Sequence, residues 1–166
     1  MCSLCVTIDY MRLLMDADCL IKLTKAGLKD LVADKYEVFI PLAVKREVVD
    51  AGKAKGCPDA VIVEKNLAAR KLSLSDTSDA FQDGDTAVSA LFQTTEYDAV
   101  ATDDSKLISR LKMTNIPHML PSVIILQLHR EAQISRELAL KCIDDLAPHI
   151  SEEEFSTVKL IIEARR

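Results

Sequence analysis

Five acidic residues occupy positions at which an α/β fold would bring their side chains to one edge of its sheet. They are Asp16, Glu47, Asp85, Asp103 and Asp104. Some of them follow short apolar runs typical of buried strands, where a carboxylate without a partner is unfavourable. Carboxylates gathered in one place repel one another unless a cation joins them. Because every ligand would be an oxygen, the pattern predicts a Mg²⁺ or Mn²⁺ site.

The elements that must position these side chains alternate between strands and helices. Apolar runs predict five strands, over residues 11–15, 36–40, 71–75, 98–102 and 117–120. The helical patterns between them predict parallel pairing by right-handed crossovers, and therefore a sheet covered on both faces. The predicted fold is α/β, a three-layer α/β/α arrangement around a central parallel sheet of about five strands. Ligands of such sheets bind at the carboxyl ends of the strands.

Three of the acidic residues lie where predicted strands end. Asp16 follows the first strand, and Asp103 and Asp104 follow the fourth. Asp18, two residues after the first strand, is interpreted as the N-cap of the next helix. The strand ends therefore supply the centre of the predicted metal site.

The other two acids lie on helices. Glu47 belongs to a helix predicted over residues 42–50, and Asp85 opens an apolar helix after a polar loop at 77–84. Taken singly, each acid has a more ordinary interpretation, as a helix cap or an exposed charge. The complete set favours the metal site.

From residue 121 onward the pattern is helical only. It predicts a helix over residues 123–130, a second capped by Ser135, and a third after Ser151. Ser151 and Glu154 have the spacing of a capping box. We therefore predict an α/β domain over residues 1–120 and a C-terminal helical extension over 121–166 that packs on the same domain.

Composition narrows the class of protein. The chain has 166 residues, a formal net charge of −5 and five cysteines. The negative charge disfavours general attraction to nucleic acid, although bound divalent ions would offset the charge of an acidic site. We find no secretory signal, no apolar stretch of membrane-spanning length and an odd number of cysteines. These features predict a cytoplasmic protein with free thiols and no membrane partner.

Four short segments resemble, in order and spacing, the motifs of PIN-domain nucleases. They are residues 14–23, 40–49, 84–87 and 100–107. The resemblance covers about residues 11–120 and implies a PIN-like ribonuclease that hydrolyses single-stranded RNA with Mg²⁺ or Mn²⁺. It carries both the catalytic and the metal-binding role onto Asp16, Glu47, Asp85, Asp103 and Asp104. The usual fourth motif selects Asp104 and some subfamilies use Asp103, so both remain candidates.

The resemblance also implies partners. RNA is the expected substrate, and toxin-like members of the family act with an antitoxin protein that blocks the site. A homodimer is a further option, for which the C-terminal helices offer a surface.

Two alternatives remain open. Asp16 and Asp18 after a strand resemble the nucleophile motif of haloacid dehalogenase-like phosphatases, but Cys19 and Leu20 depart from that motif and Glu47 would have no role. The second alternative is a non-catalytic PIN-like module that binds RNA or protein. Hydrolysis of a small phosphate ester would favour the phosphatase, and absence of Mn²⁺ binding would favour the module.

Overall fold

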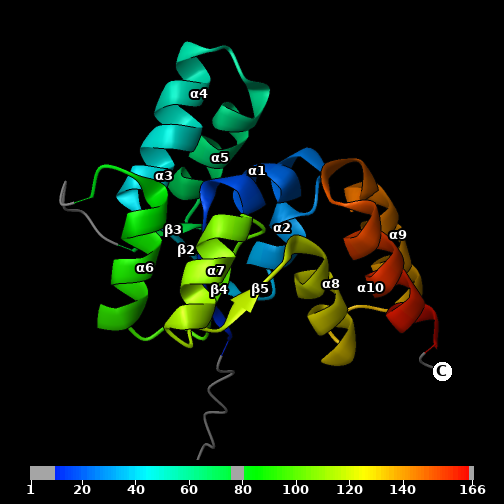
Figure 1. Ribbon diagram of the computed structural model, residues 1–166. Helices are drawn as coiled ribbons and strands as arrows, with labels where there is room; N and C mark the ends of the chain where they lie inside the picture. The colour runs from blue at the N-terminus through cyan, green and yellow to red at the C-terminus, as the bar shows by residue number, and fades with distance from the viewer. Residues whose placement is uncertain (1–9, 76–80, 165–166) are drawn as a thin grey trace, which may run out of the picture.

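The architecture is a five-stranded, all-parallel sheet in the order β3-β2-β1-β4-β5 (Figure 1). It is seen in a computed structural model that describes residues 10–75 and 81–164. The strands are β1 (Arg12–Met15), β2 (Glu37–Ile40), β3 (Ser73–Leu74), β4 (Ala99–Ala101) and β5 (His118–Met119). Leu14 of the central strand is paired with Phe39 of β2 on one side and with Val100 of β4 on the other.

Alternation along β1 divides the core into two layers. Leu13 and Met15 belong to one apolar cluster, and Leu14 belongs to a second. Successive strand side chains point to opposite faces, so each cluster covers one face of the sheet. Helices α1 (Ala17–Lys25), α2 (Lys29–Ala33) and α5 (Pro58–Ala68) pack on the first face, and α6 (Gly84–Thr94) and α7 (Ser105–Met113) on the second. The predicted three-layer α/β/α fold is confirmed.

The C-terminal helices extend the first of these clusters. They are α8 (Pro121–Arg130), α9 (Arg136–Leu146) and α10 (Glu152–Ala164), with a short 3₁₀ turn, η2 (Ala147–His149), between the last two. Ile124, Ile143 and Ile162 are fully buried and share the cluster that contains Leu13. Burial of side chains of this size contributes about 1.5–3 kcal/mol each. The three helices therefore share one apolar core with the sheet.

The helix that carries Glu47 differs from the prediction. It begins as α3 (Leu42–Lys45), widens into a π-helical turn, η1 (Arg46–Asp50), and continues as α4 (Ala51–Ala54). It thus extends past residue 50, where the prediction ended it. Gly52 allows this extension, because a Cβ there would lie 2.9 Å from the Cβ of Ala60 on α5.

The start of α10 only partly matches the predicted capping box. The Glu154 N–H donates to Ser151 Oγ at 3.1 Å, as predicted. The Glu154 carboxylate, however, accepts hydrogen bonds from the Ser122 N–H at 3.1 Å and the Ser122 hydroxyl at 2.6 Å. That carboxylate therefore ties α10 to the first turn of α8.

Across the part of the chain that the structure describes, no helix has the length and apolar character needed to cross a membrane.

Candidate metal centre

An acidic cavity of about 200 Å³ lies at the carboxyl ends of β1 and β4. It is lined by Asp16, Ala17, Asp18, Glu47, Gly84, Asp85 and Asp104. Four of the five predicted acids are therefore brought together from four separate segments of the chain. Asp18 joins them, in the first turn of α1, and the predicted site did not include it.

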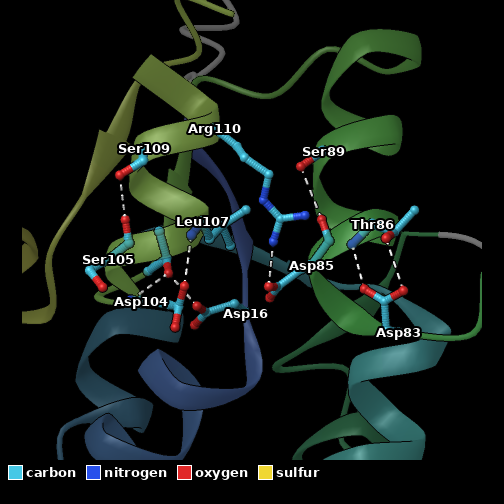
Figure 2. A network of polar contacts seen from close by, with 11 residues as sticks. Asp16, Asp83, Asp85, Thr86, Ser89, Asp104, Ser105, Leu107, Ser109 and Arg110 are labelled. Atoms are coloured by element: carbon cyan, nitrogen blue, oxygen red, sulfur yellow. Dashed lines mark hydrogen bonds and ion pairs between the residues drawn. The ribbon is translucent and has the colours of Figure 1, made fainter. Parts of the chain in front are cut away.

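Asp16 and Asp104 are held by the helices that follow their strands. Asp16 caps α1, its Oδ1 accepting from the Cys19 N–H at 2.8 Å, and Asp104 caps α7, its Oδ1 accepting from the Leu107 N–H at 2.7 Å. The capping role that we predicted for Asp18 thus belongs to Asp16. These caps fix the two carboxylates beside one another (Figure 2).

Thr102 connects the two caps. Its hydroxyl donates to Asp16 Oδ2 and accepts from the Asp104 N–H, the latter at 3.1 Å. The side chain is fully buried. Because one hydroxyl serves both acids, Thr102 sets their relative position, a role that the sequence analysis missed although the residue precedes the Asp pair.

Burial raises the pKa of Asp16 to about 7. Desolvation is the largest cause; hydrogen bonds from Thr102 and Cys19 oppose it, and the charges of Asp103 and Asp18 add to it. The Asp16 carboxyl group is therefore only partly ionised at neutral pH, and a nearby positive charge would favour its ionised form. A divalent cation would supply that charge.

This shift predicts a pH-dependent stability for the metal-free protein. The folded pKa exceeds the ordinary value of 3.8, so the contribution of Asp16 is fully present below about pH 4 and is lost as the pH rises through 7. The loss amounts to about 4 kcal/mol. We expect urea unfolding in chelator to show Asp16→Asn gaining about 2–3 kcal/mol relative to wild type between about pH 5 and pH 8. A difference independent of pH would contradict the shift.

Glu47 reaches the cavity from the π-helical turn. Such turns are frequent at functional sites, because they rotate the following side chains out of α-helical register. Burial raises the pKa of Glu47, as do the charges of Asp18, Asp85 and Asp83, whereas Lys55 lowers it. Gly84 keeps the space open, since a Cβ there would lie 2.9 Å from Val44 and 3.5 Å from Glu47 Oε2.

Asp85 lies in the first turn of α6 and is paired with a cation. Its Oδ2 accepts from an Arg110 guanidinium nitrogen at 2.6 Å (Figure 2). The helix cap itself is Asp83, which accepts from the Thr86 N–H and the Thr86 hydroxyl, each at 2.9 Å. The Asp85 carboxylate therefore faces the cavity and not its own helix end.

Asp103 is the predicted acid that does not line this cavity. It pairs with Lys22 of α1 and lines a separate hollow of about 660 Å³ between α8 and α10. Within the described residues its Oδ1 is buried without a hydrogen-bond partner. The structure thus separates the two neighbouring aspartates that the sequence left as equal candidates.

The donor set fits a hard divalent cation. Among residues 10–75 and 81–164, no three His, Cys, Asp or Glu side chains already surround a single point suited to a metal. The carboxylate oxygens of the cavity instead accept hydrogen bonds within the protein. Asp16 accepts from the Cys19 N–H and from Thr102, Asp104 accepts from the Leu107 N–H, and Asp85 accepts from Arg110. The cavity nevertheless offers only carboxylates, and burial disfavours the charge of one of them, which is the chemistry that Mg²⁺ or Mn²⁺ stabilises.

A parallel α/β/α sheet with a cavity at the carboxyl ends of its strands belongs to a class of folds that bind ligands at that edge. A family profile described as PIN domain matches residues 12–159 of the chain. The protein belongs to the PIN-domain family, and PIN domains are generally nucleases. The matched segment includes the C-terminal helices α8 and α9 and much of α10. Comparison with curated proteins gave no match.

Proposed function

We propose that the protein is a divalent-metal-dependent ribonuclease that hydrolyses phosphodiester bonds of single-stranded RNA. One observation carries the proposal: Asp16, Glu47, Asp85 and Asp104, far apart in sequence, line one cavity. The family assignment supports a nuclease over the phosphatase alternative. Retention of all four acids in one cavity favours an active enzyme over a non-catalytic module.

The four acids would have two different roles, metal binding and proton transfer. Asp16 and Asp104, joined through Thr102, would hold a Mg²⁺ or Mn²⁺ ion, with Asp85 completing the set. A bound ion would lower the pKa of the attacking water and offset charge on the phosphate. Glu47 has a raised pKa and lines the same cavity, so it suits the acceptor of the water proton. The water oxygen bonds to phosphorus as the bond to the 3′-oxygen breaks, and that oxygen takes up a proton.

Helix ends favour a phosphate at this place. Ala17 and Gly84, the first residues of α1 and α6, line the cavity together with Asp104, the cap of α7. Helix N-termini carry partial positive charge and free N–H groups, which stabilise anions. The same ends therefore stabilise the carboxylates and would attract the substrate phosphate.

A second cavity of about 230 Å³ adjoins the acidic one and shares Glu47 with it. Lys25 and Lys55 line it, and neither ammonium group has an ion-pair partner within the described residues. Lys53, in the same turn as Lys55, is paired with Glu64 at 2.9 Å. Lys25 and Lys55 are therefore placed to bind phosphate groups of the RNA strand next to the phosphate that is cleaved.

We expect the double variant Lys25→Gln, Lys55→Gln to bind RNA more weakly. Removing one lysine–phosphate interaction should lower the slope of log Kd against log salt by about 0.7, and removing both should lower it by about 1.4. Fluorescence anisotropy with a labelled single-stranded oligoribonucleotide in Ca²⁺ would measure this slope. Lys53→Gln is the matched control and should keep the wild-type slope. An unchanged slope in the double variant would exclude this strand path.

The proposal is tested by incubating the purified protein with single-stranded oligoribonucleotide in Mn²⁺ or in chelator. Products ending in a 5′-phosphate and a 3′-hydroxyl, formed only with metal, are expected. Cleavage of a small phosphate monoester but not of RNA would favour the phosphatase instead.

An inhibitory antitoxin and a homodimer stay predictions, to be tested by copurification and by sedimentation.

A further inference from the structure

Arg110, in the second turn of α7, contacts Asp85, one of the acids that line the acidic cavity. Its guanidinium donates to Asp85 Oδ2 at 2.6 Å, bridging α7 and α6 (Figure 2). The two side chains remain 45% and 42% exposed. Ion pairs this exposed contribute about 0–1 kcal/mol, so the contact can exchange readily. The ion pair therefore holds the Arg110 guanidinium only weakly and contributes little to the stability of the fold.

The Arg110 guanidinium is hydrogen-bonded to Asp85 Oδ2, an oxygen that a bound metal ion would use as a ligand. Asp85 and Glu47 line the same cavity, and Arg110 is placed to offset part of their mutual repulsion. A guanidinium stays protonated at all accessible pH values, so it supplies this charge constantly. A divalent cation entering the cavity would compete with Arg110 for the Asp85 carboxylate.

Once it is released from Asp85, the Arg110 guanidinium can bind a phosphate group. Its planar fork of N–H donors matches two oxygens of a phosphate, unlike the single ammonium of lysine. Charge on the phosphate oxygens must be stabilised while the water oxygen bonds to phosphorus and the 3′-oxygen departs. Arg110 contacts Asp85 and belongs to α7, the helix that Asp104 caps (Figure 2).

We infer that Arg110 is a catalytic residue that exchanges partners: it pairs with Asp85 in the metal-free protein and with the scissile phosphate once a cation has taken Asp85. The inference rests on the proposed ribonuclease function and adds a named group to it. It requires that the same side chain oppose metal binding and promote cleavage. A residue with only a structural role would change both properties in the same direction.

The test uses Arg110→Gln, with Lys112→Gln as the control. Lys112 lies two residues further along α7, on the other side of the helix, and its substitution removes an equal charge. Calorimetric titration with Mn²⁺ measures metal affinity independently of activity. A single-turnover cleavage assay measures the chemical step, and thermal unfolding verifies that each variant folds.

Arg110→Gln is expected to bind Mn²⁺ about two- to five-fold more tightly, because a competing cation is gone. It is also expected to cleave RNA on the order of a hundred-fold more slowly. Arg110→Lys should recover part of the rate, and Lys112→Gln should match wild type in both measurements.

Weaker Mn²⁺ binding by Arg110→Gln, or cleavage at the wild-type rate, would overturn the inference while leaving the ribonuclease proposal intact. A wild-type protein that binds Mn²⁺ but cleaves no RNA would instead remove the proposed function, and the inference with it. The two failures are therefore distinguishable.

Discussion

Asp16→Asn is expected to lose about three or more powers of ten in Mn²⁺-dependent cleavage while folding normally. An amide oxygen is a far weaker ligand for a divalent cation than a carboxylate, and Asp16 is the most buried acid of the cavity. The amide oxygen can still accept from the Cys19 N–H, and the amide NH2 can donate to the Thr102 hydroxyl, so both contacts that position the side chain are kept. The loss would therefore reflect charge and not geometry.

The matched control for this variant is Asp98→Asn. Asp98 precedes β4 at the opposite end of the strand and accepts from the Arg12 N–H at 2.6 Å, so it too is an aspartate bound to a backbone N–H. It should retain wild-type cleavage. If Asp16→Asn cleaved RNA as fast as Asp98→Asn, the assignment of Asp16 as a ligand would be wrong.

The second large effect separates two neighbouring aspartates. Asp104→Asn should lower cleavage by about two to three powers of ten, because Asp104 lines the acidic cavity beside Asp16. Asp103→Asn should keep the rate within about threefold of wild type, because Asp103 pairs with Lys22 outside that cavity. Single-turnover assays at saturating Mn²⁺ would compare the two. The reverse order of effects would make Asp103 the ligand.

Sequence reasoning predicted the sheet well because buried parallel strands appear as short apolar runs. It also placed Asp16 and the Asp103–Asp104 pair correctly at strand ends, since the carboxyl ends of parallel strands share one edge. It could not separate Asp103 from Asp104. Which of two consecutive side chains faces the cavity depends on the turn into α7, where Asp104 becomes the cap and Asp103 meets Lys22.

Other features of the fold and the site have no sequence pattern to reveal them. The π-helical turn Arg46–Asp50 arises from one wider turn inside a helix whose composition is ordinary. Helix α2 is short, and its N-cap, Leu28, makes no side-chain hydrogen bond, so the usual start signal is missing. The contact between Arg110 and Asp85 joins residues on separate helices, and only the packing of α6 beside α7 places them together.

The most direct test is a crystal structure of the wild-type protein soaked in Mn²⁺, with the metal located by anomalous scattering. We predict a peak in the acidic cavity, bonded to carboxylate oxygens of Asp16 and Asp104 at about 2.0–2.2 Å, with Arg110 displaced from Asp85. A fully soaked crystal with no peak between Asp16 and Asp104, or with its only peak beside Asp103 and Lys22, would contradict the account.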